Sequence, residues 1–386
     1  MYTVADYLWM ISDRARVEAY AGALRALVRP GARVVEVGAG FGFFSVIAAR
    51  AGAARVDAID TNPAIHIGAK VAAASGCAGA VAFHHRDSTR VELPERADLL
   101  LIDVRGTTPF APRSLELAID ARRRMLKDGG TVIAACDTVF AAPCRAPAVF
   151  RRQVQEVNGC EGVDLGPVER IARDTPLRCT VEPDDLLAAG QPWAVLDYRT
   201  LDAVDQHGDA RWRFEGEASI EGLALWFDAD LGAGFSFSNA PGSAMSTYRQ
   251  LFLPFREPVA VPAGASFRVQ IGVRAVLDRY VWTWRGCLQR QGAGERQVVD
   301  QNSLAELVLD PGALPHATHE RRPVPSVTGR ALHALLSGMD GDHTLEELAG
   351  SLARNFPELL PDGTRAMRFV SEWVAAFDRL ERGVEG

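Results

Sequence analysis

A glycine-rich turn that begins with an acidic residue gives the clearest chemical signal in the sequence. Glu36-Val37-Gly38-Ala39-Gly40-Phe41-Gly42 follows a short apolar run and precedes residues with helical spacing. Glycines such as Gly38 and Gly40 allow a tight turn and let a ligand approach the backbone, while the start of a helix offers free N–H donors. Glu36, at the end of the apolar run, could accept a hydrogen bond from a cationic amine of such a ligand.

Further acids follow the next two apolar runs. Asp60 ends the second predicted strand, where an acid can accept hydrogen bonds from both hydroxyls of a ribose. Asp87 and Ser88 follow the third, where they could meet an adenine amino group; a plain turn is the alternative for Asp87. A dinucleotide site would favour a third glycine where this chain has Phe43. The residues therefore predict an adenosine ligand without phosphates, which is S-adenosylmethionine.

The surrounding pattern predicts an α/β fold with a parallel sheet. Short β-rich runs alternate with helical segments, which is typical of a sheet with helices on both faces. The predicted strands are 34–37, 55–59, 81–87, 98–103 and 131–136, and the predicted helices lie around 43–52, 64–76 and 114–126. Two helical stretches within 1–31, ended by Pro30 and Gly31, precede them.

The later part of the chain predicts three more regions. Alternating apolar and polar runs between 193 and 289 predict an antiparallel sandwich or barrel, preceded by a helix over 149–159. Residues 291–325 are polar and proline-rich, which favours a linker, and 326–386 return to helical spacing. The predicted boundaries are therefore 32–147 for the parallel-sheet domain and 148–290 for the second domain.

Composition excludes several classes of function. The 386 residues hold 42 Lys and Arg against 49 Asp and Glu, and this net charge of −7 argues against a nucleic-acid binder. No apolar run approaches the length of a membrane span, so a membrane partner is not expected. The first residues lack a signal-peptide pattern, which predicts a cytoplasmic location. Six scattered cysteines predict free thiols and no metal site, and His84-His85 on a short strand has poor chelating geometry.

Several stretches resemble the protein arginine methyltransferase family. They are MISDRARVEAYAGAL, VVEVGAGFGFFSVIAARAGAARVDAID and VELPERADLLLIDVRG, followed by GLALWFDADL and FSNAPGSAMSTYRQLFLPFREPVAV. The resemblance implies a Rossmann-like methyltransferase domain, a β-barrel domain and a dimerisation arm at about 150–190, and hence a homodimer. It also implies that Arg16 pairs with the cofactor carboxylate and that Tyr7 and Met10 lie in a helix closing over the cofactor.

The chain departs from that family where the substrate guanidinium is held. The first of the family's two glutamates corresponds to Asp103 and the second to Pro112, and bidentate carboxylates are what orient a guanidinium. Arg105 and Arg113 add cations to the same loop, which would repel a cationic substrate. We predict that Asp103 orients or deprotonates a nitrogen nucleophile while Arg105 anchors a carboxylate of the acceptor. The alternative is a turn-capping Asp103 beside solvated arginines.

The barrel loop departs as well. The family's Thr-His-Trp reads Ser246-Thr247-Tyr248, so its histidine is absent. Tyr248 is predicted to line the acceptor pocket, with simple packing at the barrel edge as the alternative.

The C-terminal stretch PSVTGRALHALLSGMDGDHTLEELAGSLARNF resembles the winged-helix peptide chaperones of pyrroloquinoline quinone biosynthesis. That resemblance implies a precursor peptide bound by strand addition to a sheet edge. Helical packing on the barrel is the alternative.

Together these features predict a methyltransferase that transfers a methyl group from S-adenosylmethionine to a nitrogen of an arginine-like, amino-acid or peptide acceptor. Two alternatives stay open: a catalytically degenerate cofactor-binding or peptide-docking protein, and an O-methyltransferase acting on a small molecule that carries a carboxylate. A nicotinamide-dependent oxidoreductase is a weaker third.

Overall fold

The structure, a computed structural model, describes residues 2–157, 159–244, 247–276, 279–290, 292, 294–306 and 322–377. The chain divides into two compact units, Met1–Leu307 and Val308–Gly386.

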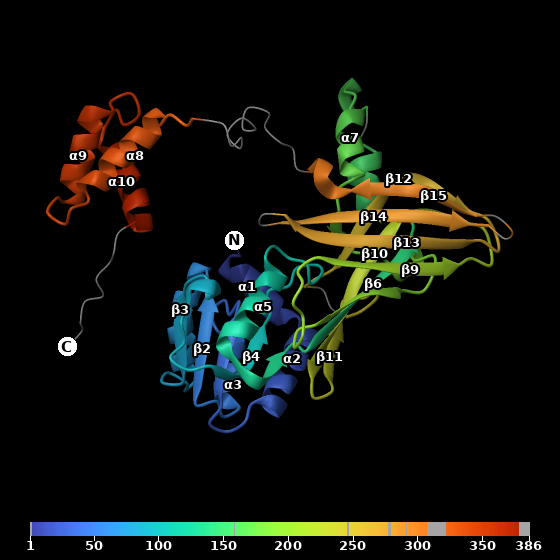
Figure 1. Cartoon of the computed structure of the whole chain (residues 1–386), viewed down its shortest axis with the longest axis horizontal. Helices are drawn as coiled ribbons and strands as arrows, with labels where there is room; N and C mark the ends of the chain where they lie inside the picture. Colours follow the sequence, from blue (N-terminus) through green and yellow to red (C-terminus); the bar gives the residue numbers. More distant parts are fainter. Residues whose placement is uncertain are drawn as a thin grey trace. The chain divides into compact units, whose positions relative to one another are not determined.

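A five-stranded parallel sheet forms the first part of the larger unit (Figure 1). Its order is β3-β2-β1-β4-β5, and every neighbouring pair is parallel. The strands are β1 (Arg33–Val37), β2 (Arg55–Asp60), β3 (Val81–His85), β4 (Ala97–Ile102) and β5 (Leu126–Ile133). The expected α/β fold is confirmed, because the mostly apolar strands are buried between layers of helices.

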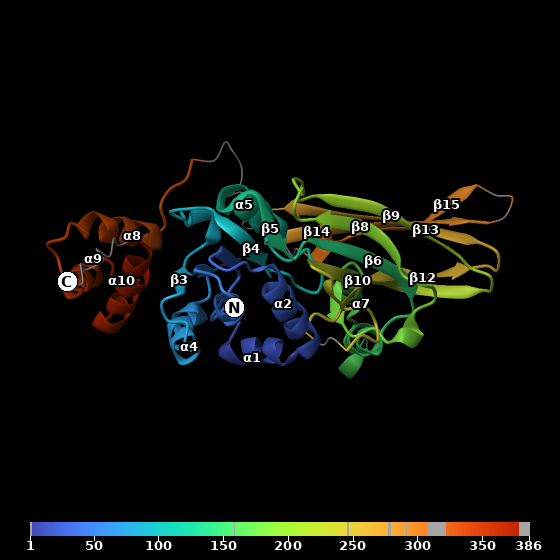
Figure 2. The ribbon, with the colours of Figure 1, turned by 90° about the horizontal axis from the view of Figure 1, so that it is seen from below.

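The helices cover this sheet on two sides. In Figure 2, α5 lies on one side, and α1, α2 and α4 lie on the other. Their bounds are α1 (Val4–Ser12), α2 (Arg14–Leu27), α3 (Phe43–Arg50), α4 (Gly68–Ala74) and α5 (Ser114–Met125), with a 3-10 turn at Pro63–Ile67 before α4. The two predicted N-terminal helices are therefore present. Thr3 and Asp6 form a capping box that starts α1, and Asp13 caps α2.

Ten antiparallel strands follow as two sheets rather than as one closed barrel. One sheet has the order β7-β12-β10-β6-β8, with β11 paired to β10, and the other has the order β15-β14-β13-β9. Large aromatic side chains, among them Phe255, Phe267 and Trp284, are buried in the core. The strands are β6 (Cys136–Cys144), β7 (Leu177–Cys179), β8 (Gln191–Asp197), β9 (Gln206–Arg213), β10 (Ala218–Gly232), β11 (Phe235–Ser238), β12 (Gln250–Val261), β13 (Ser266–Val276), β14 (Arg279–Gln289) and β15 (Glu295–Asn302).

Two predicted boundaries differ from the structure. β6 lies inside the predicted parallel-sheet domain of 32–147, yet it pairs with β10 and β8 in an antiparallel sheet. β15 lies inside the predicted linker of 291–325, of which 307–321 fall outside the described residues. As an edge strand β15 buries only Val299 and Gln301, so its sequence has little apolar alternation to reveal it.

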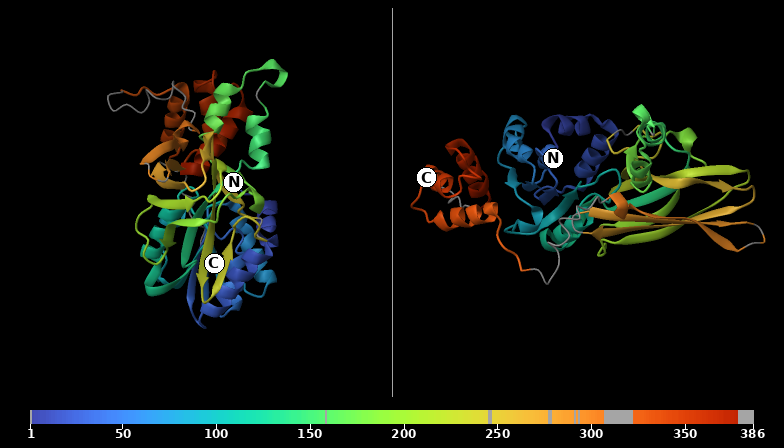
Figure 3. Two further views of the ribbon diagram at one scale, coloured as in Figure 1. Left: turned by 90° about the vertical axis from the view of Figure 1, so that its right-hand side faces the viewer. Right: turned by 90° about the horizontal axis from the view of Figure 1, so that it is seen from above.

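The segment between β6 and β7 contains several short helical elements. The helix expected over 149–159 is α6 (Ala148–Phe150) continued by one π-helical turn at Arg151–Gln155. A 3-10 turn at Cys160–Gly162 and α7 (Gly166–Ala172) follow, and α7 projects from the two antiparallel sheets (Figure 3). This segment is where the dimerisation arm was expected.

The C-terminal unit is helical, as predicted. It contains α8 (Val327–Gly338), α9 (Leu345–Asn355) and α10 (Gly363–Phe377), and its core includes Leu335, Leu348, Leu352 and Val370. Residues 322–377 contain no strand. The wing of the expected winged helix is therefore missing from the described part of this unit, and so is the sheet edge that strand addition requires.

Among the described residues no helix is long and apolar enough to cross a membrane.

Candidate functional site

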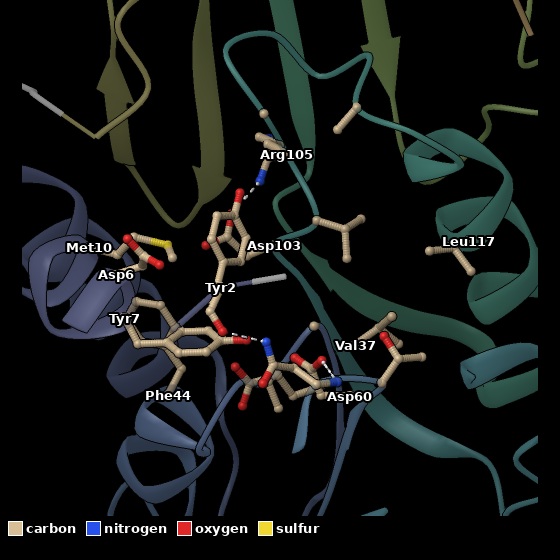
Figure 4. Close-up of a pocket in the computed structure, with 18 of the residues that line it drawn as sticks. Tyr2, Asp6, Tyr7, Met10, Val37, Phe44, Asp60, Asp103, Arg105 and Leu117 are labelled. Atoms are coloured by element: carbon tan, nitrogen blue, oxygen red, sulfur yellow. Dashed lines mark hydrogen bonds and ion pairs between the residues drawn. The ribbon is translucent and has the colours of Figure 1, made fainter. Parts of the chain in front are cut away.

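A cavity of about 730 Å³ opens at the carboxyl ends of β1, β2, β3 and β4. Open α/β sheets bind ligands at this edge. Eleven of the twelve predicted site residues line it: Tyr7, Met10, Arg16, Glu36, Gly38, Asp60, Asp87, Ser88, Asp103, Arg105 and Tyr248. Figure 4 shows Tyr7 and Met10 coming from α1, and Asp103 and Arg105 coming from the loop after β4.

Gly40, the twelfth residue, acts through its backbone. Its φ of 56° lies in the left-handed region, and a Cβ there would lie 2.6 Å from the Tyr7 ring. The Gly40 N–H donates to Asp60 Oδ2 over 2.7 Å. A side chain at this position would displace Tyr7, and with it the helix that closes over the turn.

Glu36 is a buried carboxyl group facing the cavity. Ser45 Oγ, at the start of α3, donates a hydrogen bond to it. Burial raises the pKa of Glu36 to about 8, against the lowering effect of the Ser45 hydroxyl. A cationic ligand group at this position would restore the ionised form.

Asp60 is held by two backbone donors. Gly40 N–H binds one carboxylate oxygen, and Asn62 N–H binds the other over 2.7 Å. Asn62 Nδ2 in turn donates to the Tyr2 carbonyl over 2.9 Å, which ties the residues before α1 to this loop. The carboxylate is thereby fixed with lone pairs left for a ligand.

Asp87 and Ser88 lie at the β3 end of the cavity. Arg113 Nη1 donates to Asp87 Oδ2 over 2.8 Å. Burial alone would raise the pKa of Asp87. The hydrogen bonds from Arg113 and Thr89 outweigh burial and lower this pKa to about 2. Ser88 Oγ is buried and has no hydrogen-bond partner among the described residues. Asp87 balances the charge of Arg113, which weakens the repulsion that Arg113 was expected to exert on a cationic acceptor.

Asp103 is enclosed by partners from this chain. Arg16 Nη2 donates to Oδ2, Tyr248 Oη donates to Oδ1 over 2.9 Å, and Arg105 Nη1 lies 3.5 Å from Oδ1. Burial would raise the pKa of Asp103, but the Arg16 and Arg105 guanidiniums outweigh burial and hold this pKa below its usual range. An acid held in its ionised form accepts hydrogen bonds well and is a weak base. The orienting role predicted for Asp103 fits this geometry, and the deprotonating role does not.

Arg105 is saturated by protein acceptors. Its Nε and Nη2 donate to Asp137 over 2.7 and 2.9 Å, and its Nη1 donates to Tyr20 Oη over 2.7 Å. Its side chain is 4% exposed. The prediction that Arg105 anchors a carboxylate of the acceptor does not fit, because its donors already hold the acceptor loop to α2 and β6.

Tyr248 lines the cavity as predicted and also packs in the core. Its ring contacts Phe227 and Phe237, and its hydroxyl accepts from Arg16 Nε over 3.2 Å. Arg16, predicted to meet a cofactor carboxylate, therefore lies between Asp103 and Tyr248 at the same cavity wall.

Sequence reasoning missed Asp137, Tyr20 and Arg178. Asp137 is fully buried and also accepts from Tyr198 Oη over 2.7 Å. Asp137 is the single charged residue in the apolar run CDTVF, and a charge buried in such a run requires a partner. This was the available sequence signal for the ion pair. Arg178 lines the cavity and donates to the Thr247 carbonyl over 2.6 Å, and nothing in its local sequence marks it.

The predicted structural role of His84-His85 fits the geometry. His84 Nε2 lies 2.9 Å from Asp57 Oδ1, while His85 meets His66 and the Thr61 carbonyl. The two rings point to different partners.

The chain is similar in sequence to known arginine methyltransferases, although no family model matches it. It is 28% identical over 231 residues to the probable protein arginine N-methyltransferase 6 of Arabidopsis thaliana, covering 57% of this chain and about half, 53%, of the plant protein. It is 25% identical over 270 residues to the arginine N(omega)-methyltransferase of Streptomyces achromogenes subsp. streptozoticus, covering 68% of this chain and 74% of that protein.

Solved structures show the same architecture. A chain of the Trypanosoma brucei PRMT1 enzyme–prozyme heterotetrameric complex with AdoHcy superposes with a TM-score of 0.69 at 17% identity, covering 77% of this chain and 97% of that one. Arabidopsis thaliana protein arginine methyltransferase 10 gives 0.64 at 18% identity, covering 76% and 96%. The chain has the protein arginine methyltransferase fold. The cavity described above lies within this fold.

Proposed function

We propose that this chain is an S-adenosylmethionine-dependent methyltransferase that acts on a nitrogen atom of an amino-acid, arginine-like or peptide acceptor. The observation that carries the proposal is one cavity lined by buried Glu36, fixed Asp60 and unpartnered Ser88, which follow three neighbouring strands. The sequence similarity to arginine N-methyltransferases supports it.

The residues present fit such a cofactor. Glu36 would face its ammonium group, Asp60 its ribose hydroxyls and Ser88 its adenine. Ser88 is 5% exposed and its Oγ has no partner among the residues that the structure describes, and a buried hydroxyl is costly until a ligand satisfies it. Tyr7 and Met10 on α1 would cover the bound molecule.

When bound, the cofactor supplies a methyl group on a positively charged sulfur, which needs little acid–base assistance. The chain's task is therefore to position an acceptor that already has a lone pair. Asp103 would accept a hydrogen bond from the acceptor nitrogen and orient it. Tyr248 and Arg16 hold that carboxylate in place, and Arg105 fixes the loop behind it.

Calorimetry with S-adenosylhomocysteine and with NAD tests the cofactor. We expect S-adenosylhomocysteine to bind with micromolar affinity or better and NAD not to bind. Binding of NAD alone would contradict the proposal.

A catalytically degenerate protein is the second candidate, and the enclosure of Asp103 by Arg16 and Arg105 favours it. Transfer of a labelled methyl group to a panel of amino acids and arginine-containing peptides separates the two candidates. A cofactor-binding protein that methylates no member of the panel would support degeneracy.

We also propose a homodimer formed through the arm segment of residues 150–172. Val157, Val163, Val168 and Ile171 are exposed on it. Exposed apolar side chains gathered on one projecting element are typical of an interaction surface.

A cytoplasmic location is supported by the described cysteines, all six of which are free. A precursor peptide at the C-terminal unit stays a prediction from the resemblance alone.

A further inference from the structure

We propose that the methyl acceptor carries a carboxylate group, which Arg178 and Thr247 bind at the end of the cavity next to Asp103. This inference deepens the proposed function and rests on it. It concerns the acceptor end of the cavity, where the loop after β4 meets Thr247 and Tyr248.

The charges at this end leave no free carboxylate for a cationic acceptor group. Arg16 and Arg105 balance Asp103 and Asp137, and all four side chains are at least nine-tenths buried. Desolvated charges need such a balance. A third cation brought to Asp103 would compete with the two guanidiniums already there, whereas an uncharged nitrogen could still donate a hydrogen bond to it.

The other acids of the cavity also have partners, and Glu36, whose raised pKa keeps it mostly protonated near neutral pH, accepts a hydrogen bond from Ser45. Asp6 caps α1 through Thr3, Asp60 binds two backbone N–H groups, and Asp87 pairs with Arg113. The chain therefore offers an acceptor little unshared negative charge.

Arg178 supplies positive charge at the same place. It comes from β7, opposite Leu251 of β12, and it lines the cavity. Its Nη2 donates to the Thr247 carbonyl over 2.6 Å, and it forms no ion pair with any described carboxylate. The guanidinium is thus held in position while most of its donors stay available for an anion.

Thr247 supplies a second, independent signal. The residue is 5% exposed, and its Oγ1 has no hydrogen-bond partner among the described residues. Its backbone N–H donates to Asp13 Oδ2 over 3.0 Å and its carbonyl accepts from Arg178, so the residue is fixed from both sides, and its hydroxyl is buried in the wall of the cavity without a partner among the described residues. A buried donor without a partner is satisfied when a ligand oxygen fills the site.

The position of the two residues limits the size of the acceptor. Thr247 precedes Tyr248, whose hydroxyl touches Asp103. A carboxylate bound at Thr247 and Arg178 would therefore lie next to the residue that holds Asp103, and we expect an acceptor small enough to join the two positions, such as a free amino acid.

Isothermal titration of the S-adenosylhomocysteine-saturated protein with paired ligands tests this inference. The pairs differ only in the carboxylate, and each carries a side-chain nitrogen that is uncharged at about pH 8: L-histidine and histamine, L-tryptophan and tryptamine, L-glutamine and 4-aminobutanamide. We expect at least one amino acid to bind about tenfold more tightly than its amine. Tighter or equal binding of all three amines, or no binding of any amino acid, would overturn the inference.

Variants locate the carboxylate. Arg178→Gln should remove most of the preference, and Thr247→Val should reduce it severalfold, while the affinity for S-adenosylhomocysteine and the melting temperature stay unchanged. Arg25→Gln, at an exposed residue of α2 outside the cavity, is the charge-matched control. A preference that survives both site variants overturns the assignment. The same titrations are repeated on protein without S-adenosylhomocysteine, so that the carboxylate preference is measured independently of cofactor binding. Binding of S-adenosylhomocysteine itself tests only the proposed function.

Discussion

At the scale of single residues, the decisive feature is a carboxylate whose neighbours belong to the same chain. Asp103 accepts from Arg16 and Tyr248 and lies beside Arg105. A carboxylate accepts about four hydrogen bonds, so it retains room for one more donor. That remaining position is where the acceptor nitrogen would be oriented.

We expect Asp103→Asn to lower the free energy of unfolding by about 3–5 kcal/mol, because it leaves two buried guanidiniums short of one counter-charge. Methyl transfer should fall to near background while S-adenosylhomocysteine still binds. Urea denaturation and calorimetry measure the two effects.

Tyr248→Phe serves as the milder companion, since it removes two hydrogen bonds, one to Asp103 and one from Arg16, without changing the charge balance. It should lower kcat severalfold and leave cofactor affinity intact. Unchanged turnover in both variants would remove Asp103 from the reaction.

The pH dependence of stability is set in part by Glu36. Burial raises its pKa to about 8 from a usual 4.5, so between these values the folded chain holds a proton that the unfolded chain releases. The contribution of Glu36 to stability is therefore full below about pH 4.5 and is lost as the pH rises through about 8. Between these two values the free energy of unfolding should fall by up to about 1.4 kcal/mol per pH unit. Glu36→Gln should flatten this slope in denaturation curves taken at a series of pH values. An identical slope in both proteins would show that another group is responsible.

The cofactor end of the site could be predicted from the sequence, and the acceptor end only in part. Gly40, Asp60 and Ser88 follow strands with clear apolar patterns, so their common edge follows from parallel pairing. Arg105 and Asp137 are 32 positions apart in the sequence. Arg105 follows β4 of the parallel sheet, and Asp137 lies on β6 of an antiparallel sheet. Local spacing carries no information about such a contact.

At the scale of elements, the crossing of β8 and β9 depends on a glycine. A Cβ at Gly208 would lie 1.8 Å from the Trp193 carbonyl oxygen, a backbone atom that cannot move without its strand. We expect Gly208→Ala to destabilise the larger unit by at least about 1–3 kcal/mol in urea denaturation. Gly216→Ala, near the end of β9 with nothing within 4 Å of its Cβ, is the control and should be neutral. Equal stability of the two variants would contradict the close approach.

The elements that sequence reasoning identified best are those with one buried face and clear ends. α5 spans Ser114–Met125 against an expectation of 114–126, and β1 differs from its prediction by one residue. β6 was assigned to the wrong domain because it follows β5 after two residues, with no turn signal between them. Its partners, β8 and β10, lie 50 or more positions along the chain, so only tertiary pairing reveals its sheet.

At the scale of the whole molecule, the division at Leu307 predicts two unfolding events. Leu335 is fully buried in the core of the smaller unit. We expect Leu335→Ala to cost that unit about 2–5 kcal/mol and to leave the larger unit unchanged. Limited proteolysis should then remove the C-terminal segment while S-adenosylhomocysteine binding persists. A loss of cofactor binding in this variant would show that the units unfold together.

The arm gives the second prediction at this scale. Val168 and Ile171 are 62% and 39% exposed on α7, and a carboxylate at both positions should prevent their burial between two chains. We expect the Val168→Asp, Ile171→Asp double variant to run at half the mass of the unmodified protein in light scattering. Val195→Asp, at a residue 61% exposed on β8, is the matched control and should keep the larger mass. A monomeric unmodified protein would contradict the proposed dimer.

The ion pair between Arg105 and Asp137 also bears on how such a chain can change over generations. The arginine belongs to the loop after β4, and the aspartate belongs to β6, an interior strand of the neighbouring antiparallel sheet. A hybrid gene that joined residues 1–135 to a foreign barrel would bury a lone guanidinium unless the incoming strand carried a carboxylate at the matching position. We therefore expect the two sheets to be inherited together, because exchange of either one alone breaks this ion pair.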